Sequence, residues 1–236
     1  MKQFSKTKSL WLHFYPGILI TLFFIIVAPI MTANGLPPQL AMLTAIIVVV
    51  VPVMLLHLHR ATKNEGLATI SELIVYKNDI STGKIVLYAL GMIVFAFLVY
   101  GATQPLNQVI TDKLLFWLPD WYTIQDFSGY SKDIIVITLI ANLILNGIIA
   151  PFIEEIYFRG YLMPRMQSWG KLVPFMSAIL FSLYHFWQPQ VYLTLIIALM
   201  PMTYFTWKLK SLKLAIITHC GLNIIGALLS FAMINQ

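Results

Sequence analysis

The residues of this sequence that could do chemistry are acidic, basic and histidine side chains set within apolar segments of its second half. They are Glu154, Glu155, Arg159, His185 and His219. An ionisable group inside a membrane-spanning helix costs about 3 kcal/mol on insertion scales, so such groups are rare and usually serve a function. The three apolar segments before residue 104 contain no Asp or Glu. We therefore expect any chemistry in the C-terminal half.

Two adjacent glutamates predict a division of roles. Residues four apart share one face of a helix, whereas consecutive residues diverge by about 100°. Glu155 should therefore meet Arg159, and Glu154 should point elsewhere with no ionic partner on its own helix. An acidic side chain placed in this way suits a general base. The alternative is that both acids only neutralise Arg159.

The same spacing of four occurs twice more, in Phe181 with His185 and in His219 with Asn223. Measured along helices from the basic residues at their ends, Glu154 and His185 lie about 16 Å deep, and His219 and Asn223 about 9 and 15 Å deep. These depths predict one polar cavity, which we expect to open to the cytoplasm. The alternative for each histidine is a hydrogen bond between packed helices.

The composition shows which elements must position these residues. The chain has 236 residues, of which 59% are hydrophobic and 10% charged, with a mean hydropathy of +0.83. Soluble domains carry about 25% charged residues. The sequence therefore predicts an all-α, polytopic transmembrane helix bundle of about seven spans, with a kinked or re-entrant pair near 172–207. The spans are placed near 10–31, 39–58, 84–103, 134–162, 172–187, 190–207 and 212–234.

The distribution of lysine and arginine predicts the orientation. Basic residues gather in the N-terminus and in alternate loops, whereas the other loops carry none or balance them with acids. By the positive-inside rule the N-terminus is cytoplasmic and the C-terminus lies outside, in a multi-pass protein of the cell membrane. The net charge of +6 thus reflects topology, and we expect no nucleic-acid partner. We expect a single membrane domain, 1–236, in which 1–132 supplies N-terminal spans and interfacial segments and 133–234 forms the core.

The ordered motifs resemble those of one family of membrane enzymes. They are Glu154-Glu155-x-x-x-Arg159, Phe181-x-x-x-His185 and His219-x-x-x-Asn223. This set resembles the CPBP family, the CAAX protease and bacteriocin-processing enzymes also called Abi proteins, which includes the type II CAAX prenyl endopeptidases. The resemblance implies an intramembrane endopeptidase with a catalytic core over 133–234. It also implies roles: Glu154 activates water, His185 assists, His219 and Asn223 stabilise the oxyanion, and Glu155 and Arg159 orient the site.

The cofactor and the substrate stay open in the sequence. Glu154, His185 and His219 would also form a zinc site of two histidines and one carboxylate. A metal-free reaction is favoured because Asn223 is a poor zinc ligand and the H-E-x-x-H motif is absent. The expected partners are the lipid bilayer and a peptide or protein substrate, either prenylated or a bacteriocin precursor. The competing functions are a transporter with the same polar cavity and a non-enzymatic immunity or assembly partner.

Overall fold

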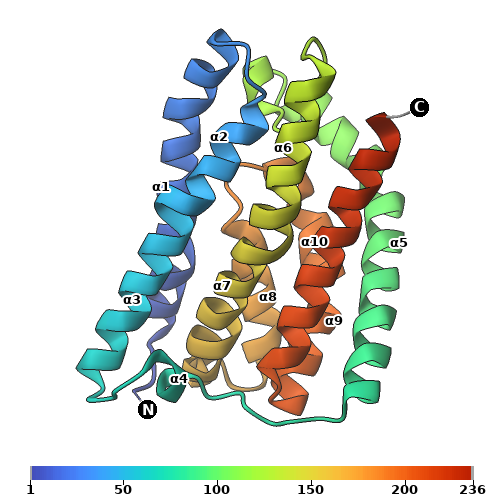
Figure 1. Ribbon diagram of the computed structural model, residues 1–236. Coiled ribbons are helices and arrows are strands. Elements are labelled where there is room, and N and C mark those ends of the chain that lie inside the picture. Colours follow the sequence, from blue (N-terminus) through green and yellow to red (C-terminus); the bar gives the residue numbers. More distant parts are fainter. Residues whose placement is uncertain (1, 235–236) are drawn as a thin grey trace.

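A computed structural model describes residues 2–234, which form helices and contain no strand beyond one isolated bridge between Lys77 and Ser211 (Figure 1). The α-helices are α1 (Lys6–Ala33), α2 (Pro38–Ala45), α3 (Val51–Asn64), α4 (Ile70–Leu73), α5 (Thr82–Leu114), α6 (Lys132–Ile144), α7 (Ala150–Glu154), α8 (Val173–Leu183), α9 (Tyr192–Leu209) and α10 (Leu212–Ile234). The π-helical segments are η1 (Ile46–Val50), η3 (Leu145–Ile149) and η4 (Glu155–Leu162). Short 3₁₀ turns are η2 (Asp120–Tyr122), η5 (Met163–Arg165), η6 (Gln167–Leu172) and η7 (Pro189–Val191).

The expected polytopic helix bundle is confirmed, with one difference in the spans. Six helices of the described chain are long and apolar enough to cross a membrane: Lys6–Ala33, Pro38–Asn64, Thr82–Leu114, Lys132–Arg165, Pro189–Leu209 and Leu212–Ala232. The segment predicted as the fifth span is the short α8, whose 11 residues reach only about 16 Å of the roughly 30 Å hydrocarbon core. The two termini nevertheless lie at opposite ends of the bundle (Figure 1). The segment from α8 to η7 therefore supplies a seventh passage through the bundle, made of the short α8 and the non-helical stretch after it rather than of one long helix.

The lysines and arginines gather at the end of the bundle where the N-terminus lies. Backbone hydrogen bonds tie three connections together there: the Phe4 amide donates to the Arg165 carbonyl at 2.8 Å, and the Asn78 amide donates to the Lys210 carbonyl at 2.9 Å. Of the fifteen lysines and arginines, all but Lys113, Lys132 and Arg159 lie in the segments at this end. We call it the basic end, and we call the opposite end, where α2 and α6 begin, the distal end (Figure 1).

Three prolines account for the irregular turns of the bundle. Each π-helical segment ends two residues before a proline, namely Pro52, Pro151 and Pro164. Proline lacks an N–H, and its ring collides with the carbonyl four residues earlier, so a regular α-helix cannot continue through it without distortion. A widened π turn before the proline relieves that collision and keeps the chain helical. Two of these turns, η3 and η4, flank the acidic pair.

Two connections differ from the interfacial segments expected within 1–132. The apolar residues around Leu106 to Leu114 belong to α5, which continues as one helix of 33 residues. After it, Trp117 is exposed, whereas Trp121 packs edge-on against Phe24 of α1 at 5.9 Å between ring centroids. The stretch that carries Ile70 forms only the one-turn helix α4. The distal connection therefore packs onto the bundle and covers part of that end.

Candidate active site

The two adjacent glutamates stand where the helix changes from α to π. Glu154 is the last residue of α7, and Glu155 is the first residue of η4. Both side chains are buried, and Glu155 is completely so. The distorted backbone continues without a break from Lys132 to Arg165, so the pair is held on one rod deep within the bundle.

Glu155 is the centre of a buried ionic cluster. Its Oε1 lies 3.1 Å from Arg159 Nη1, which is the contact that the spacing of four predicted. The same oxygen lies 2.8 Å from Nδ1 of His219 on α10. Arg159 in turn donates to Thr203 Oγ1 of α9 at 3.3 Å, and its guanidinium lies 3.8 Å from the centre of the Phe181 ring. Glu155 and Arg159 thus tie together helices α8, α9 and α10.

Glu154 has a different partner, as its position beside Glu155 led us to expect. Its Oε1 accepts a hydrogen bond from the hydroxyl of Tyr184, which directly follows α8. No lysine or arginine forms an ion pair with it among the residues that the structure describes. Tyr184 is completely buried, and a buried tyrosine hydroxyl requires a hydrogen-bond partner. The structure therefore separates the two acids: Glu155 is paired with Arg159 and contacts His219, whereas Glu154 is held by a neutral donor.

The position of Tyr184 depends on a close approach of α1. A Cβ atom on Gly17 would lie 2.1 Å from the Tyr184 carbonyl oxygen and 2.9 Å from its ring. Only glycine leaves room for this contact. The N-terminal half therefore helps to position a side chain that touches Glu154.

The remaining motif residues are held by carbonyl groups. Nδ1 of His185 lies 2.9 Å from the Phe181 carbonyl oxygen, and because a carbonyl only accepts, Nδ1 carries the hydrogen. Nε2 of a neutral His185 is then an acceptor. Asn223 donates through Nδ2 to the Asn146 carbonyl at 2.9 Å, which lies in the π-helical segment η3. The second N–H of that amide stays free for another acceptor.

These side chains share one cavity, as the matching depths predicted. The cavity has a volume of about 670 Å³ and is lined by Glu154, Tyr184, His185, His219 and Asn223 together with apolar side chains from α5, α6, α9 and α10. Glu154 is the only carboxylate in this lining.

The cavity extends from Glu154 toward the distal end. Its lining includes Gln39, Gln125 and Ser230, all of which lie in segments near that end. On the basic side of Glu154, the side chains of Tyr157 and Phe158 are completely buried and are not part of the lining. The expected opening to the cytoplasm stays a prediction, because it depends on which end of the bundle lies in the cytoplasm.

The side chains expected as zinc ligands do not form a cluster in the described part of the chain. Among the residues that the structure describes, no three His, Cys, Asp or Glu side chains are grouped so as to hold a metal ion. Nδ1 of His219 faces Glu155 and Nδ1 of His185 faces a carbonyl, so only the Nε2 atoms of the two rings could reach a ligand in the cavity.

Sequence reasoning missed several polar residues of the site. Tyr184, Thr203 and Asn146 were not among the predicted site residues. A tyrosine next to His185 in an apolar helix was the available signal, since its hydroxyl must find a partner. Asn146 acts through its backbone, which no side-chain pattern reveals.

The comparison with protein families identifies this part of the chain. Residues 136–225 match the family described as type II CAAX prenyl endopeptidase Rce1-like. All the residues of the three motifs lie inside this range. The matched range covers less than half of the chain, and no curated protein and no solved structure matches the chain.

At the level of the family, the match confirms the resemblance that we inferred from the three motifs. It supports an intramembrane CAAX protease and an integral, multi-pass membrane protein. The link to bacteriocin processing and the name Abi have no specific support in this match. The family match assigns no role to single residues, so the roles argued below depend on the geometry.

Proposed function

We propose that the protein is an intramembrane endopeptidase in which Glu154 is the general base. One observation carries the proposal: of two adjacent buried glutamates, Glu155 is bound by Arg159 and His219, whereas Glu154 lines the cavity and meets only the hydroxyl of Tyr184. An acid with no cation beside it is free to take a proton from water.

The proposed reaction is the hydrolysis of a peptide bond. Glu154 takes a proton from a water molecule whose oxygen attacks the carbonyl carbon of the substrate, and Nε2 of His185 helps to orient that water. The tetrahedral intermediate then loses its amine. Glu154 returns the proton to the leaving nitrogen, so the products are a carboxylic acid and an amine, and the glutamate is regenerated.

His219 and Asn223 are proposed to stabilise the negative oxygen of the intermediate. Donors held in place before the reaction lower its barrier most effectively, because they need no reorganisation. Glu155 fixes His219 through Nδ1, and the Asn146 carbonyl fixes one N–H of Asn223. Asn223 is left with one N–H for the oxyanion, and Nε2 of His219 donates to it when both nitrogens of that ring carry hydrogen. Glu155 and Arg159 are proposed to act as positioning residues.

The substrate is proposed to be a peptide with an apolar or lipid-modified segment. The cavity walls include Phe97, Leu139, Leu195 and Leu222, which would receive such a segment. Prenylated peptides are the first candidates because the matched family is named for them. A bacteriocin precursor stays an alternative within the same chemical class.

We propose that the basic end lies in the cytoplasm of the cell and that the substrate reaches Glu154 from the distal side. The first part follows from the positive-inside rule, since twelve of the fifteen lysines and arginines lie in segments at that end. The second part follows from the cavity lining, which extends toward Gln125 and Ser230.

The reaction is proposed to need no metal ion, because every motif residue has a role without one. Zinc remains the alternative, bound by Glu154, His185 and His219, in which case it would activate the water.

A cleavage assay in proteoliposomes tests the proposal. The panel contains prenylated and unprenylated peptides, and wild type is compared with Glu154→Gln and with Asp133→Asn, an exposed acid on the same helical rod. We expect at least one peptide to be cut, with rates roughly 10²–10⁴-fold lower in Glu154→Gln and unchanged in Asp133→Asn.

Two results would contradict parts of the proposal. Loss of cleavage with a chelator and recovery with zinc would show that Glu154, His185 and His219 are metal ligands. Failure to cut any peptide, with an intact fold, would favour the non-enzymatic partner; substrate uptake that depends on Glu154 would favour a transporter.

A further inference from the structure

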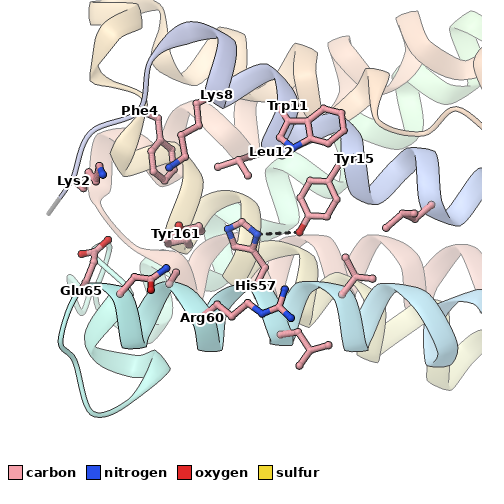
Figure 2. A pocket seen from close by; sticks show the side chains of 15 residues that line it. Lys2, Phe4, Lys8, Trp11, Leu12, Tyr15, His57, Arg60, Glu65 and Tyr161 are labelled. Atoms are coloured by element: carbon pink, nitrogen blue, oxygen red, sulfur yellow. Dashed lines mark hydrogen bonds between the residues drawn. The ribbon is translucent and has the colours of Figure 1, made fainter.

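A second cavity lies at the basic end, away from Glu154. It has a volume of about 830 Å³ and lies between the first half of α1 and the second half of α3 (Figure 2). None of its lining residues belongs to the cavity of Glu154. We call it the α1–α3 groove. The reaction proposed above does not use it.

The charged residues of the α1–α3 groove are mostly basic. Lys2, Lys8 and Arg60 line it, and the single acid in the lining is Glu65. Glu65 is already neutralised, because its Oε1 lies 3.1 Å from Arg165 Nη2. Arg60 is exposed and has no hydrogen bond or ion pair within residues 2–234. The groove therefore has an uncompensated positive charge.

The rest of the groove is apolar and faces outward. Trp11 is 61% exposed, Leu56 54% and Leu19 40%, although all three lie within predicted membrane spans. Side chains of this kind, exposed on a membrane helix, contact lipid. Along α1 the aromatic rings follow Lys8 and precede Leu19: Trp11 stacks on Tyr15 with ring centroids 6.0 Å apart, and Tyr15 is joined to His57 at 3.1 Å (Figure 2). Aromatic side chains of this type favour the headgroup level.

This order of groups matches the order of groups in one class of ligand. A phospholipid has an anionic headgroup, a polar glycerol region and an apolar chain. Basic pockets between membrane helices bind anionic headgroups, and each nearby Lys or Arg contributes about 1 kcal/mol. We propose that the α1–α3 groove binds an anionic phospholipid, with its phosphate between Lys8 and Arg60 and one acyl chain along Trp11, Leu19 and Leu56.

Lys8 has a contact that a bound phosphate would replace. Its ammonium lies 4.5 Å above the ring of Phe4, which is a weak cation–π contact that can be exchanged for a phosphate. Arg60 has no contact to give up, so we expect it to contribute most to binding.

Native mass spectrometry of the detergent-solubilised protein tests this site. The probes are dioleoylphosphatidylglycerol, dioleoylphosphatidylcholine and soluble glycerol phosphate. The groove variant is Lys8→Gln with Arg60→Gln. The control is Lys84→Gln with Lys171→Gln, which removes two exposed charges near the same end but outside the groove.

We expect wild type to retain phosphatidylglycerol in preference to phosphatidylcholine and the groove variant, which lacks two cations, to bind phosphatidylglycerol roughly 30-fold more weakly. The control variant should bind like wild type, and Lys8→Arg with Arg60→Lys should restore binding. Equal losses in both neutralised variants, no preference between the two lipids, or equally effective competition by glycerol phosphate would overturn the proposal.

Discussion

The N-terminal helices α1 to α5 and the C-terminal segment α6 to α10 both contain widened π turns, but they place different residues on them. The N-terminal turn η1 consists only of isoleucine and valine. The C-terminal turns η3 and η4 carry Asn146, Glu155 and Arg159. All three turns precede a proline. A following proline is common to all three widened turns, and the polar residues of η3 and η4 distinguish them from η1.

The two regions also differ in how they use buried charge. Glu154, Glu155, Arg159 and His219 are buried in the C-terminal segment. The buried residues of α5 are all apolar, and the one ionisable side chain buried in α1, His13, has its Nδ1 2.7 Å from the Ser9 carbonyl oxygen of its own helix. The N-terminal half contributes support instead, since Gly17 lets Tyr184 approach and the Leu12 carbonyl accepts from Tyr157 at 2.9 Å. The predictions below test this division between chemistry and support.

The largest effect on stability is expected at the buried ion pair. Arg159→Leu leaves Glu155 with no cation except a protonated His219, and breaking a buried pair costs about 3–5 kcal/mol. Unfolding in detergent, followed by circular dichroism, measures the loss. Lys213→Ala is the matched control, because its contact with Asp79 is 3.8 Å long and exposed. Equal stability of the two variants would show that the ion pair between Glu155 and Arg159 does not stabilise the fold.

A smaller effect is expected where the N-terminal half meets the site. Gly17→Ala forces a methyl group against the Tyr184 carbonyl, and overpacking of this kind costs about 1–3 kcal/mol. Cleavage should fall as well, because Tyr184 holds Glu154. Gly101→Ala in α5 is the control, since its new methyl group meets no atom within 4 Å. Unchanged cleavage in Gly17→Ala would show that α1 does not position Tyr184 for catalysis.

A smaller effect still is expected from Tyr184→Phe, which deletes only the hydroxyl that donates to Glu154. A hydrogen bond contributes about 1 kcal/mol, so cleavage should change roughly fivefold. Tyr204→Phe on α9 is the control, because no hydrogen bond of its hydroxyl occurs within residues 2–234. Kinetics in proteoliposomes separate kcat from KM. A purely structural role of Tyr184 would lower thermal stability and leave kcat intact.

The orientation of the two ends is tested by labelling, which does not depend on activity. In a Cys220→Ser background, a cysteine at Lys171 or at Gln125 is treated in whole cells with a membrane-impermeant thiol reagent. We expect labelling of the distal Gln125→Cys only. Labelling of Lys171→Cys instead would show that the orientation is the opposite one and that the cavity extends toward the cytoplasm.

Much of the fold followed from apolar segment length and from the placement of lysine and arginine. The segment 172–187 was harder, because hydropathy detects apolar length and α8 ends after 11 residues at a turn through Tyr184. The extension of α5 beyond residue 103 was missed because its last turns are polar enough to resemble a loop.

The candidate site was predictable where it depended on helical spacing and unpredictable where it depended on tertiary contacts. A spacing of four was sufficient to predict the contact between Glu155 and Arg159. The pairing of Glu155 with His219, 64 residues away, required the three-dimensional structure. The same holds for the burial of Tyr157 and Phe158, since side-chain burial on one side of a helix depends on its neighbours.

The most direct test of the account compares Glu154→Gln with Glu155→Gln in one experiment that measures both cleavage and thermal unfolding. The account predicts that Glu154→Gln loses cleavage and keeps its unfolding temperature, because it removes the base but no ion pair. Glu155→Gln should lower the unfolding temperature, because it removes the carboxylate between Arg159 and His219. Normal cleavage by a folded Glu154→Gln protein would contradict the central claim.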